Sequence, residues 1–486
     1  MRRLPVVLTV VLVLVLALAG YATLDIYDKV PGILTRASAA PSADARAGRS
    51  APAPGQRVVH GPVPDVAGAP ALVPADGPGE AATAAPIPTT AGLRHALGAE
   101  LRDPRLGGLV GATIRDGVTG RHLLDVRANR PMTPASNTKL LTAAAVSSAL
   151  DLARTLDTTV VRGRGAHDIV LVSGGDTLLA PGRSDPSSVV GHAGLATLAG
   201  QVANALHDKG IGSVRLQLDD SFADGAPYAP GWDPAVIAHG YVGPVTTLGL
   251  ARDRADDVHA APKDTAMSAA RVFVTQLARH HIRVRGEVTR ARAPQGAPTL
   301  GAVRSARLED VLAYALQQSD NALTEELARI AAVHAGRPAT FGATAQWVQQ
   351  TVHRLGIDTR GVHLVDSCGL SDGTRIPPRV IGDVLGLALD GHEPAFRDVV
   401  AKLPVAGLNG TLDDRFRLPG GADAAGTARA KTGSLPGVSA LAGTVVDHDG
   451  RLLVFALIAN KSANPIETRA ALDRVVGTLS DCGCRR

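Results

Sequence analysis

Three short strings occur in a fixed order along the chain, and any fold of this chain has to accommodate their joint presence. They read Ser136-Asn137-Thr138-Lys139, Ser319-Asp320-Asn321 and Lys431-Thr432-Gly433-Ser434. Each supplies one part of acyl-transfer chemistry: a hydroxyl nucleophile with an amine three residues on, a second hydroxyl beside an amide, and a cation beside small hydroxyl residues. Their order makes the set specific, although each string alone carries no weight.

Lysine is rare in this chain, so chance placement of surface lysines explains the three strings poorly. The chain contains 7 Lys and 43 Arg, and two of the lysines lie in the strings. A guanidinium stays protonated and cannot act as a base, whereas an amine can. Lysine in such a chain therefore indicates positions where a titratable or point-like amine is needed.

The first string begins a helix that is apolar nearly all round, from Asn137 through a Thr-Lys-Leu-Leu-Thr-Ala-Ala-Ala-Val run. This pattern predicts a buried helix with Ser136 in its first turn and Lys139 on the same face. Burial and the helix N-terminus both disfavour an ammonium ion, so we expect a lowered pKa for Lys139. A neutral Lys139 can accept the Ser136 proton.

The second string lies between two predicted helices, residues 306–318 and 322–335. A bend there presents Ser319 and Asn321 on one side and turns Asp320 away. Ser319 is then a candidate proton relay to a leaving amine, and the Asn321 amide a candidate contact for a substrate carbonyl. As an isolated string, Ser-Asp-Asn is also typical of a helix cap.

The third string begins a predicted three-stranded β pattern, followed by a helix at 465–479; the strands are 428–435, 438–446 and 452–459. An edge strand here offers a backbone N–H to an oxyanion, while Lys431, Thr432 and Ser434 attract a substrate carboxylate. Gly433 removes a side chain so that substrate can lie close. Further upstream, 91–103 is predicted to be helical, 109–114 and 123–126 to form a hairpin, and 268–280 to form a helix.

The N-terminal part differs in composition from the rest. Residues 1–24 combine Arg2 and Arg3 with an apolar run, typical of an export signal or a membrane anchor, and residues 25–90 form an Ala/Pro-rich linker predicted to be disordered. Everything after Asp25 is expected outside the cytoplasm. The net charge of +5 comes from scattered Arg without aromatic interleaving, which disfavours nucleic acid as a partner.

Cysteine usage gives one further expectation. The three cysteines are Cys368, Cys482 and Cys484, and no zinc pattern is present. A disulfide between Cys482 and Cys484 would be tight, and the odd count leaves at least one thiol unpaired in a monomer.

Together the three strings resemble the signature of penicillin-binding proteins and class A β-lactamases. The gap of 183 residues between Ser136 and Ser319 is similar to that of the peptidase S13 family, the class C low-molecular-mass penicillin-binding proteins. Further strings resemble this family from about residue 91 to 480: 171–178, 219–222 with Gly231-Trp232, 241–248 and 403–412. One departure is Cys368, where the family usually has Ser before Gly-Leu-Ser.

This resemblance implies an α/β (α+β) fold, in which a penicillin-binding-protein-like catalytic domain holds an antiparallel sheet between helices. The catalytic domain is expected at 91–164 and 301–486, and smaller inserted domains at 165–300. The implied activity is that of a serine D-Ala-D-Ala carboxypeptidase, with endopeptidase activity as a further option, acting on peptidoglycan stem peptides in the cell envelope. Ser136 is the implied nucleophile, Lys139 its base, and Ser319, Asn321 and Lys431 further catalytic residues; Thr432, Gly433 and Ser434 are the implied substrate-binding residues.

The resemblance also implies that β-lactam antibiotics acylate Ser136 and that no metal or organic cofactor takes part. Backbone N–H groups of Ser136 and Ser434 are implied to hold the oxyanion. Two other functions fit the motifs less well. A secreted class A β-lactamase needs a Glu-x-x-x-Asn string after the second motif, which this chain lacks. A non-catalytic, penicillin-binding wall scaffold would not need every motif side chain.

Overall fold

The computed structural model describes residues 84–254 and 261–485. The predicted signal or anchor at 1–24 lies outside the described residues, as does the predicted linker up to residue 83. Within the described ranges, no helix combines the length and the apolar character that crossing a membrane requires.

A five-stranded antiparallel sheet contains strands from the beginning and from the end of the described chain. Its order is β11 (Arg429–Leu435), β12 (Val438–Val446), β13 (Leu452–Asn460), β1 (Leu109–Asp116) and β2 (His122–Val126). Strand β1 pairs with β13 from Leu109 opposite Asn460 to Asp116 opposite Leu453. The predicted strands and the hairpin are therefore confirmed, and β11, which carries the third string, lies at an edge of the sheet.

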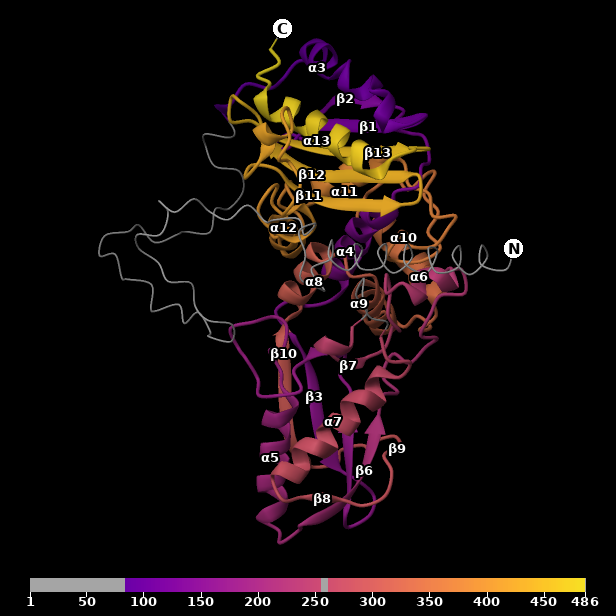
Figure 1. The fold of residues 1–486 in the computed structure, drawn as a ribbon, viewed down its shortest axis with the longest axis vertical. Coiled ribbons are helices and arrows are strands. Elements are labelled where there is room, and N and C mark those ends of the chain that lie inside the picture. The colour runs from indigo at the N-terminus through magenta and orange to yellow at the C-terminus, as the bar shows by residue number, and fades with distance from the viewer. Residues whose placement is uncertain (1–83, 255–260, 486) are drawn as a thin grey trace, which may run out of the picture. The chain divides into compact units, whose positions relative to one another are not determined.

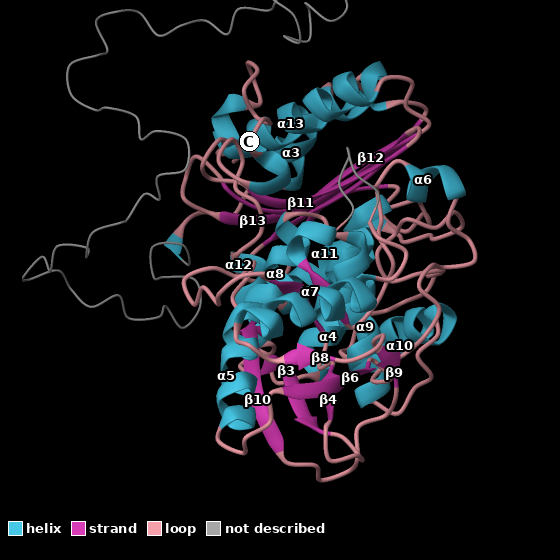
Figure 2. Cartoon of the chain, turned by 60° about the horizontal axis from the view of Figure 1, so that its bottom comes forward, coloured by secondary structure: helices cyan, strands magenta, loops and turns pink. Residues whose placement is uncertain are grey.

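Helices cover both faces of this sheet, as Figures 1 and 2 show. Helices α3 (Thr90–Leu97) and α13 (Pro465–Asp481) pack on one face. The other face is covered by a group of six helices: α4 (Thr138–Ala149), α8 (Leu308–Gln317), α9 (Asn321–His334), α10 (Phe341–Arg354), α11 (Pro378–Leu387) and α12 (Pro394–Ala401). The predicted antiparallel sheet between helical layers is confirmed.

The sequence of β13 explains why it lies at the centre of these layers. Phe455 and Leu457 belong to the core under α13, while Ala456 and Ile458 belong to the core under α4 and α11. Successive side chains of a strand point to opposite faces, so a strand buried on both sides must be apolar throughout. The run 452–459 meets this requirement.

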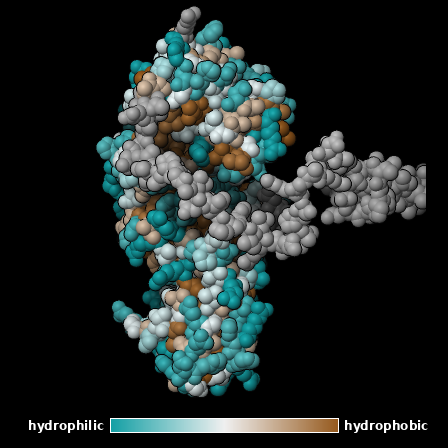
Figure 3. Space-filling view, turned by 90° about the vertical axis from the view of Figure 1, so that its left-hand side faces the viewer, coloured by the Kyte–Doolittle hydropathy of each residue, from teal (hydrophilic) through white to brown (hydrophobic). Residues whose placement is uncertain are grey.

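A second, mixed sheet is formed by the middle of the chain. Its order is β10 (Thr299–Arg307), β3 (Thr155–Arg162), β4 (Asp168–Val172), β6 (Ser213–Asp219) and β8 (Arg283–Val284), and β9 (Thr289–Arg290) also pairs with β6. Helices α5 (Leu195–His207) and α7 (Thr265–Arg279) pack on it, and nearby lie the short β5 (Asp176–Leu179), β7 (Leu248–Leu250) and α6 (Pro234–Ala238). On the face drawn in Figure 3, the lower part, where this sheet lies, is mainly hydrophilic.

The limits of this sheet differ slightly from the predicted insert at 165–300. Strand β3 begins at Thr155 and β10 ends at Arg307, and these two strands pair with each other along most of their length. They lead into and out of the second sheet. The assignment of separate domains stays a prediction.

One predicted helix is shorter than expected. The pattern at 91–103 predicts one continuous helix, but α3 ends at Leu97 and two short 3-10 helices follow, Glu100–Arg102 and Pro104–Leu106. Gly98 disfavours a helix interior, and Pro104 disfavours helical backbone at the residue before it.

Candidate active site

Ser136 lies in a 3-10 turn directly before α4, rather than in the first turn of the α-helix. The turn spans Ala135–Asn137, and Ala135 has a φ of 48°, in the left-handed region. The Thr138 hydroxyl donates to the Ala135 carbonyl at 2.9 Å. Non-glycine residues in this conformation are strained and concentrate at functional sites. The turn thus holds the candidate nucleophile directly before the first residue of a buried helix.

The Lys139 amine is completely buried behind Ser136. Its Nζ lies 2.9 Å from Ser136 Oγ, 2.6 Å from Asn321 Oδ1 and 3.0 Å from the Cys368 carbonyl oxygen. Burial lowers the pKa of Lys139, although nearby acidic groups oppose the shift. A neutral amine has two N–H groups, which suffice for the two oxygens that can only accept. Its lone pair then faces the Ser136 hydroxyl, the geometry of a general base.

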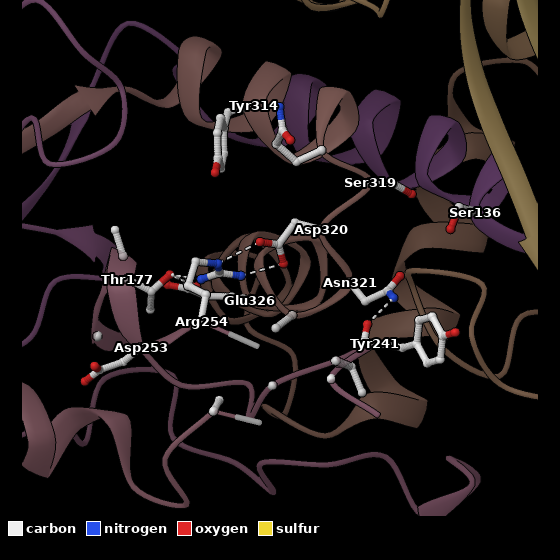
Figure 4. Close-up of a pocket in the computed structure, with 18 of the residues that line it drawn as sticks. Ser136, Thr177, Tyr241, Asp253, Arg254, Tyr314, Ser319, Asp320, Asn321 and Glu326 are labelled. Atoms are coloured by element: carbon white, nitrogen blue, oxygen red, sulfur yellow. Dashed lines mark hydrogen bonds and ion pairs between the residues drawn. The ribbon is translucent and has the colours of Figure 1, made fainter. Parts of the chain in front are cut away.

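The second string forms the bend between α8 and α9. Ser319 has a φ of 55°, and the Asp320 side chain caps α9 by accepting from Leu323 N at 2.9 Å. The capping interpretation is therefore confirmed for Asp320, and the functional interpretation of Ser319 and Asn321 stays a prediction. Asp320 turns away from the nucleophile and pairs with Arg254, with Nε 2.7 Å from Oδ2. Figure 4 shows Ser319 and Ser136 at one end of the pocket and the Asp320–Arg254 pair apart from them.

Asn321 is already engaged on both sides of its amide. Its Oδ1 accepts from Lys139, and its Nδ2 donates to the Tyr241 carbonyl at 2.7 Å (Figure 4). Nδ2 carries two N–H groups, so a substrate carbonyl can accept from the second while the Tyr241 contact is kept. Binding of a substrate carbonyl by Asn321 stays a prediction.

The third string places Lys431 beside Ser319. Lys431 Nζ lies 2.8 Å from Ser319 Oγ and 2.8 Å from the Thr432 carbonyl oxygen. Burial, together with the neighbouring Lys139, holds the pKa of Lys431 well below its ordinary value. The Thr432 hydroxyl donates to Thr411 Oγ1 at 2.9 Å. Each of the two motif lysines therefore contacts one motif serine.

Gly433 allows the edge strand to approach the turn that carries Ser136. A Cβ at this position would lie 2.7 Å from the Pro134 carbonyl oxygen and 3.2 Å from the Ala135 Cβ. The 2.7 Å approach is closer than side-chain packing permits. The sequence predicts that glycine makes room for substrate; the structure adds that it makes room for the chain's own residues 134–135.

These residues meet in one cleft of about 780 Å³. Ser136, Ser319, Asn321, Thr432 and Ser434 line it, and Lys139 and Lys431 lie behind the two serines to which they are hydrogen-bonded. The cleft is also lined by residues of the middle of the chain, among them Thr177 and 249–254. The eight candidate site residues thus lie together, and their catalytic roles stay predictions.

Several contacts at the site were not predicted from the sequence. The Cys368 carbonyl contacts Lys139, and Glu325 Oε1 accepts from the backbone N–H groups of Ser367 and Cys368 at 2.7 Å each. A backbone carbonyl carries no sequence signal, since every residue has one. Glu325 does carry a signal, because adjacent glutamates inside an otherwise apolar helix are costly unless they are hydrogen-bonded.

Within the described residues, the side chains of Glu325, Asp366 and Cys368 are the one group of potential metal ligands that lie within 4.8 Å of one another. Three of the four carboxylate oxygens already accept hydrogen bonds, and those of Asp366 do so from Gly369 N, Ser371 N and Trp232 Nε1. Burial raises the pKa of the Cys368 thiol well above its ordinary value, which keeps it protonated. This donor set fits a hydrogen-bonded loop rather than a metal ion.

The other two cysteines, Cys482 and Cys484, are joined by a disulfide, and Cys368 is free and buried. The prediction of an unpaired thiol is confirmed.

Comparison with known proteins identifies relatives along nearly the whole described chain. The sequence profile described as the D-Ala-D-Ala carboxypeptidase 3 (S13) family matches residues 93–257 and 251–479. Carboxypeptidase DacB of Mycolicibacterium smegmatis is 37% identical over 399 residues, covering 81% of this chain and 85% of the relative. A carboxypeptidase of Mycobacterium tuberculosis is 35% identical over 451 residues, covering 90% of this chain and 92% of the relative.

Among solved structures, penicillin binding protein 4 from Haemophilus influenzae has a similar fold. It is 21% identical, with a TM-score of 0.64, and the match covers 81% of this chain and 98% of that protein. Its complex with a novel β-lactam matches with 22% identity and a TM-score of 0.57, over the same shares of the two chains. This likeness supports the fold, and the sequence relatives support the family predicted from the motifs.

Since the profile matches most of the chain, and two carboxypeptidases are 35% and 37% identical over most of their own length, the chain belongs to the D-Ala-D-Ala carboxypeptidase 3 (S13) family.

Proposed function

We propose that this protein is a serine-type D-Ala-D-Ala carboxypeptidase, which removes the terminal D-alanine of peptidoglycan stem peptides through an acyl-enzyme on Ser136. The observation that carries the proposal is the position of the buried Lys139 amine, 2.9 Å from Ser136 Oγ and hydrogen-bonded to two carbonyl oxygens. Membership of the family and the names of its relatives support the substrate class.

Acylation begins when neutral Lys139 accepts the Ser136 proton. The Oγ atom then forms a bond to the penultimate D-Ala carbonyl carbon, and the carbonyl oxygen becomes an oxyanion. Backbone N–H groups of Ser136 and Ser434 would stabilise this charge, and β11, as an edge strand, has one side free of a neighbouring strand.

Collapse of the tetrahedral intermediate breaks the bond to the leaving amine, which needs a proton. A role of Ser319 in this step is supported by its hydroxyl, which is hydrogen-bonded to Lys431 at 2.8 Å, and by its position in the same cleft as Ser136. Ser319 can pass its proton to the leaving amine and regain the proton that Lys139 took from Ser136, which leaves Lys139 neutral again. Water then attacks the ester and regenerates Ser136.

The same geometry supports acylation by β-lactam antibiotics, and a similar fold in Haemophilus influenzae has been solved with a β-lactam. We further propose that the protein works outside the cytoplasm, in the cell envelope, where its polymeric substrate lies. Residues 1–24 would direct export or anchor the protein in the membrane. Endopeptidase activity on cross-linked stems is a second part of the proposal, because the open cleft of about 780 Å³ is large.

Labelling with fluorescent penicillin tests the nucleophile. We expect Ser136→Ala to abolish labelling and to lower D-Ala release more than about 10⁴-fold, because no other hydroxyl can form the acyl-enzyme. Ser148→Ala is a matched control on the exposed side of the same helix, where the Ser148 hydroxyl donates only to the Ala145 carbonyl. Labelling that survives Ser136→Ala, or is lost in Ser148→Ala, would contradict the assignment.

A second measurement ranks the two proposed activities. Release of D-Ala from a pentapeptide is compared with cleavage of cross-linked dimers by the same enzyme. Cleavage of dimers at a comparable kcat/KM would support the endopeptidase part, whereas intact dimers would remove it. A protein that is labelled by penicillin but cleaves neither substrate would favour the scaffold alternative.

A further inference from the structure

A second pocket lies beside the catalytic cleft, and no step of the proposed mechanism uses it. Its volume is about 490 Å³. Thr246 lines both spaces, whereas Val245 and Thr247 line only the second of the two. We call it the Arg329 pocket, after the residue of α9 that lines it; the rest of its wall comes from residues within 218–227, 263–266 and 290–292.

Arg329 is the most deeply buried charged side chain of this pocket, with only 3% of the residue exposed. Its Nη1 donates to the Val245 carbonyl at 3.3 Å, and its Nη2 donates to the Ala226 carbonyl at 2.7 Å. The guanidinium also lies over the Phe341 ring, with Cζ 4.9 Å from the ring centre. Among the described residues it has no further hydrogen bond and no ion pair. Because a guanidinium carries five N–H groups, three of them are left for a ligand.

The acids near Arg329 compensate its charge poorly. Three of them act on it electrostatically: Glu325, Glu326 and Asp224. Burial raises the pKa of Glu325 to about 8 and the pKa of Glu326 well above its ordinary value, so both keep a proton at neutral pH. Asp224 is exposed, and solvent screens its charge. A buried cation without a counter-charge is costly, and an anion in the pocket would remove that cost.

Two further cations of the pocket wall are available to a ligand. Lys263 and Arg292 are exposed, and neither side chain makes a hydrogen bond or an ion pair within the part of the chain that the structure describes. Arg290 differs, because it holds Asp220 at 2.8 Å and Asp264 at 2.9 Å. The pocket therefore combines one buried cation with two exposed ones that have no acidic partner.

The balance of charge favours an anion with a single negative charge. The pocket is lined by four cationic and four acidic side chains, so its formal charge is zero: Lys263, Arg290, Arg292 and Arg329 against Asp219, Asp220, Asp224 and Asp264. A wall of this kind has no surplus of positive charge with which to hold a multiply charged anion. The planar guanidinium fork matches a carboxylate, with which it can form two parallel N–H···O bonds.

We propose that the Arg329 pocket binds a small carboxylate ligand outside the catalytic cleft. Arg329 contacts the carboxylate group, and Lys263 and Arg292 attract it from solvent. Asp224 opposes the binding, because its charge acts on the same guanidinium. The ligand would lie against Thr246, next to the cleft but separate from the reacting groups.

A titration with trifluoroacetate, followed by ¹⁹F NMR at constant ionic strength, tests the proposal. We expect saturable binding that Arg329→Gln weakens about 10- to 100-fold, because a charge-assisted hydrogen bond is lost. Lys263→Gln and Arg292→Gln should each weaken binding about two- to fivefold, as expected for exposed charges. Asp224→Asn should strengthen it by a similar factor.

Two exposed residues outside the pocket provide matched controls, Lys209→Gln for Lys263→Gln and Arg283→Gln for Arg292→Gln. Both should bind the probe as the wild-type protein does. If Arg329→Gln does not fold, since it also releases two backbone carbonyls, the exposed variants still decide. Affinity that is unchanged in Lys263→Gln and Arg292→Gln, or is not raised in Asp224→Asn, would overturn the proposal.

Two more measurements test the ligand class and the location. Acetate should displace the probe at a lower concentration than inorganic phosphate at pH 7.5, and the reverse order would overturn the preference for a carboxylate. Protein acylated with benzylpenicillin should bind the probe unchanged, whereas loss of binding would place the site in the cleft and overturn the proposal. If benzylpenicillin does not acylate the protein, the proposed function fails, while the variants above still test the pocket.

Discussion

Lys139 has three hydrogen-bond neighbours, of which the Asn321 amide oxygen and the Cys368 carbonyl oxygen can only accept. A protonated amine would donate to all three neighbours, whereas a neutral amine donates to two and accepts from the Ser136 hydroxyl. Complete burial favours the neutral form. The role of Lys139 therefore depends on its surroundings as much as on its identity.

This gives a pH prediction for acylation. Because the reactive form is neutral and the pKa of Lys139 is lowered from 10.5, the rate of penicillin acylation should rise with pH through an apparent pKa below that value. Lys139→Arg should lower the rate about 10²- to 10⁴-fold, since a guanidinium stays protonated. Stopped-flow acylation between pH 5 and 10 measures this. A flat profile in the wild-type enzyme would contradict the base assignment.

At the scale of elements, helix α9 supports the base through the loop that contains Cys368. Glu325 in α9 accepts from Ser367 N and Cys368 N, and the Cys368 carbonyl in turn contacts Lys139. Burial, with a smaller effect of Asp366, raises the pKa of Glu325 to about 8. Glu325 is therefore a positioning residue that the fold holds in its neutral form.

Substitution of Glu325 should change how stability depends on pH. The pKa of Glu325 in the fold, about 8, lies above its ordinary 4.5, so the folded state keeps a proton that the unfolded state releases between these values. The free energy of unfolding therefore falls as pH rises through this window, by up to about 1.4 kcal/mol per pH unit. Glu325→Gln keeps an acceptor oxygen and removes this loss, so its Tm should rise relative to wild type from pH 5 to pH 8.

Two further variants complete this test. Glu287→Gln, at an exposed position, should leave the difference in Tm independent of pH. Glu325→Ala leaves two buried N–H groups without their acceptor and should cost about 1–3 kcal/mol of stability and slow the acylation of Ser136. If the difference in Tm from wild type is independent of pH for both Glu287→Gln and Glu325→Gln, the pKa of Glu325 is not raised in the folded state.

At the scale of the whole molecule, polar and charged side chains beside the cleft join the catalytic helices to the short strands β5 and β7, which pair with each other. Arg254, which follows β7, pairs with Asp320 at the start of α9 and donates to Thr177 Oγ1 of β5 at 3.1 Å. Thr177 donates in turn to Glu326 of α9 at 2.7 Å. Although burial alone would raise the pKa of Asp320, the Arg254 guanidinium holds it below its ordinary value. The middle residue of the second string thus works as a structural link.

A double-mutant cycle measures this link. Arg254→Met and Asp320→Asn should each lower the free energy of unfolding by about 3 kcal/mol, because each leaves a largely buried polar partner unpaired. The double variant should lose less than the sum, with a coupling of at least about 1 kcal/mol. Urea denaturation provides the values.

The matched control is the pair Arg215 and Asp168, which lies within the second sheet, with 66% of the Arg215 side chain exposed. An exposed pair of this kind is expected to couple by less than about 1 kcal/mol. Additive effects in the Arg254–Asp320 cycle would show that the link does not hold the two parts together.

Local patterns predicted much of the fold and most of the site. Strands β11 to β13 were predicted from runs of apolar residues with a turn between them. Helix α4 was predicted from a run of residues that are apolar on nearly every side of a helix. These features are local, since strand and helix periodicity is written in neighbouring residues. The motif strings named all five catalytic candidates, because hydroxyl, amine and amide chemistry needs those residue types.

Contacts between distant segments could not be predicted in this way. Arg254 meets Asp320 across 66 residues, Cys368 meets Lys139 across 229, and Arg469 meets Ser434 across 35. A backbone carbonyl, or one of many arginines, has no pattern of its own, and its role arises only from what the folded chain places beside it. The sequence by itself determined the chemistry of the site and the elements that carry it. Only the tertiary structure decided that both motif lysines have a lowered pKa and which arginine pairs with Asp320, because burial and distance set charge.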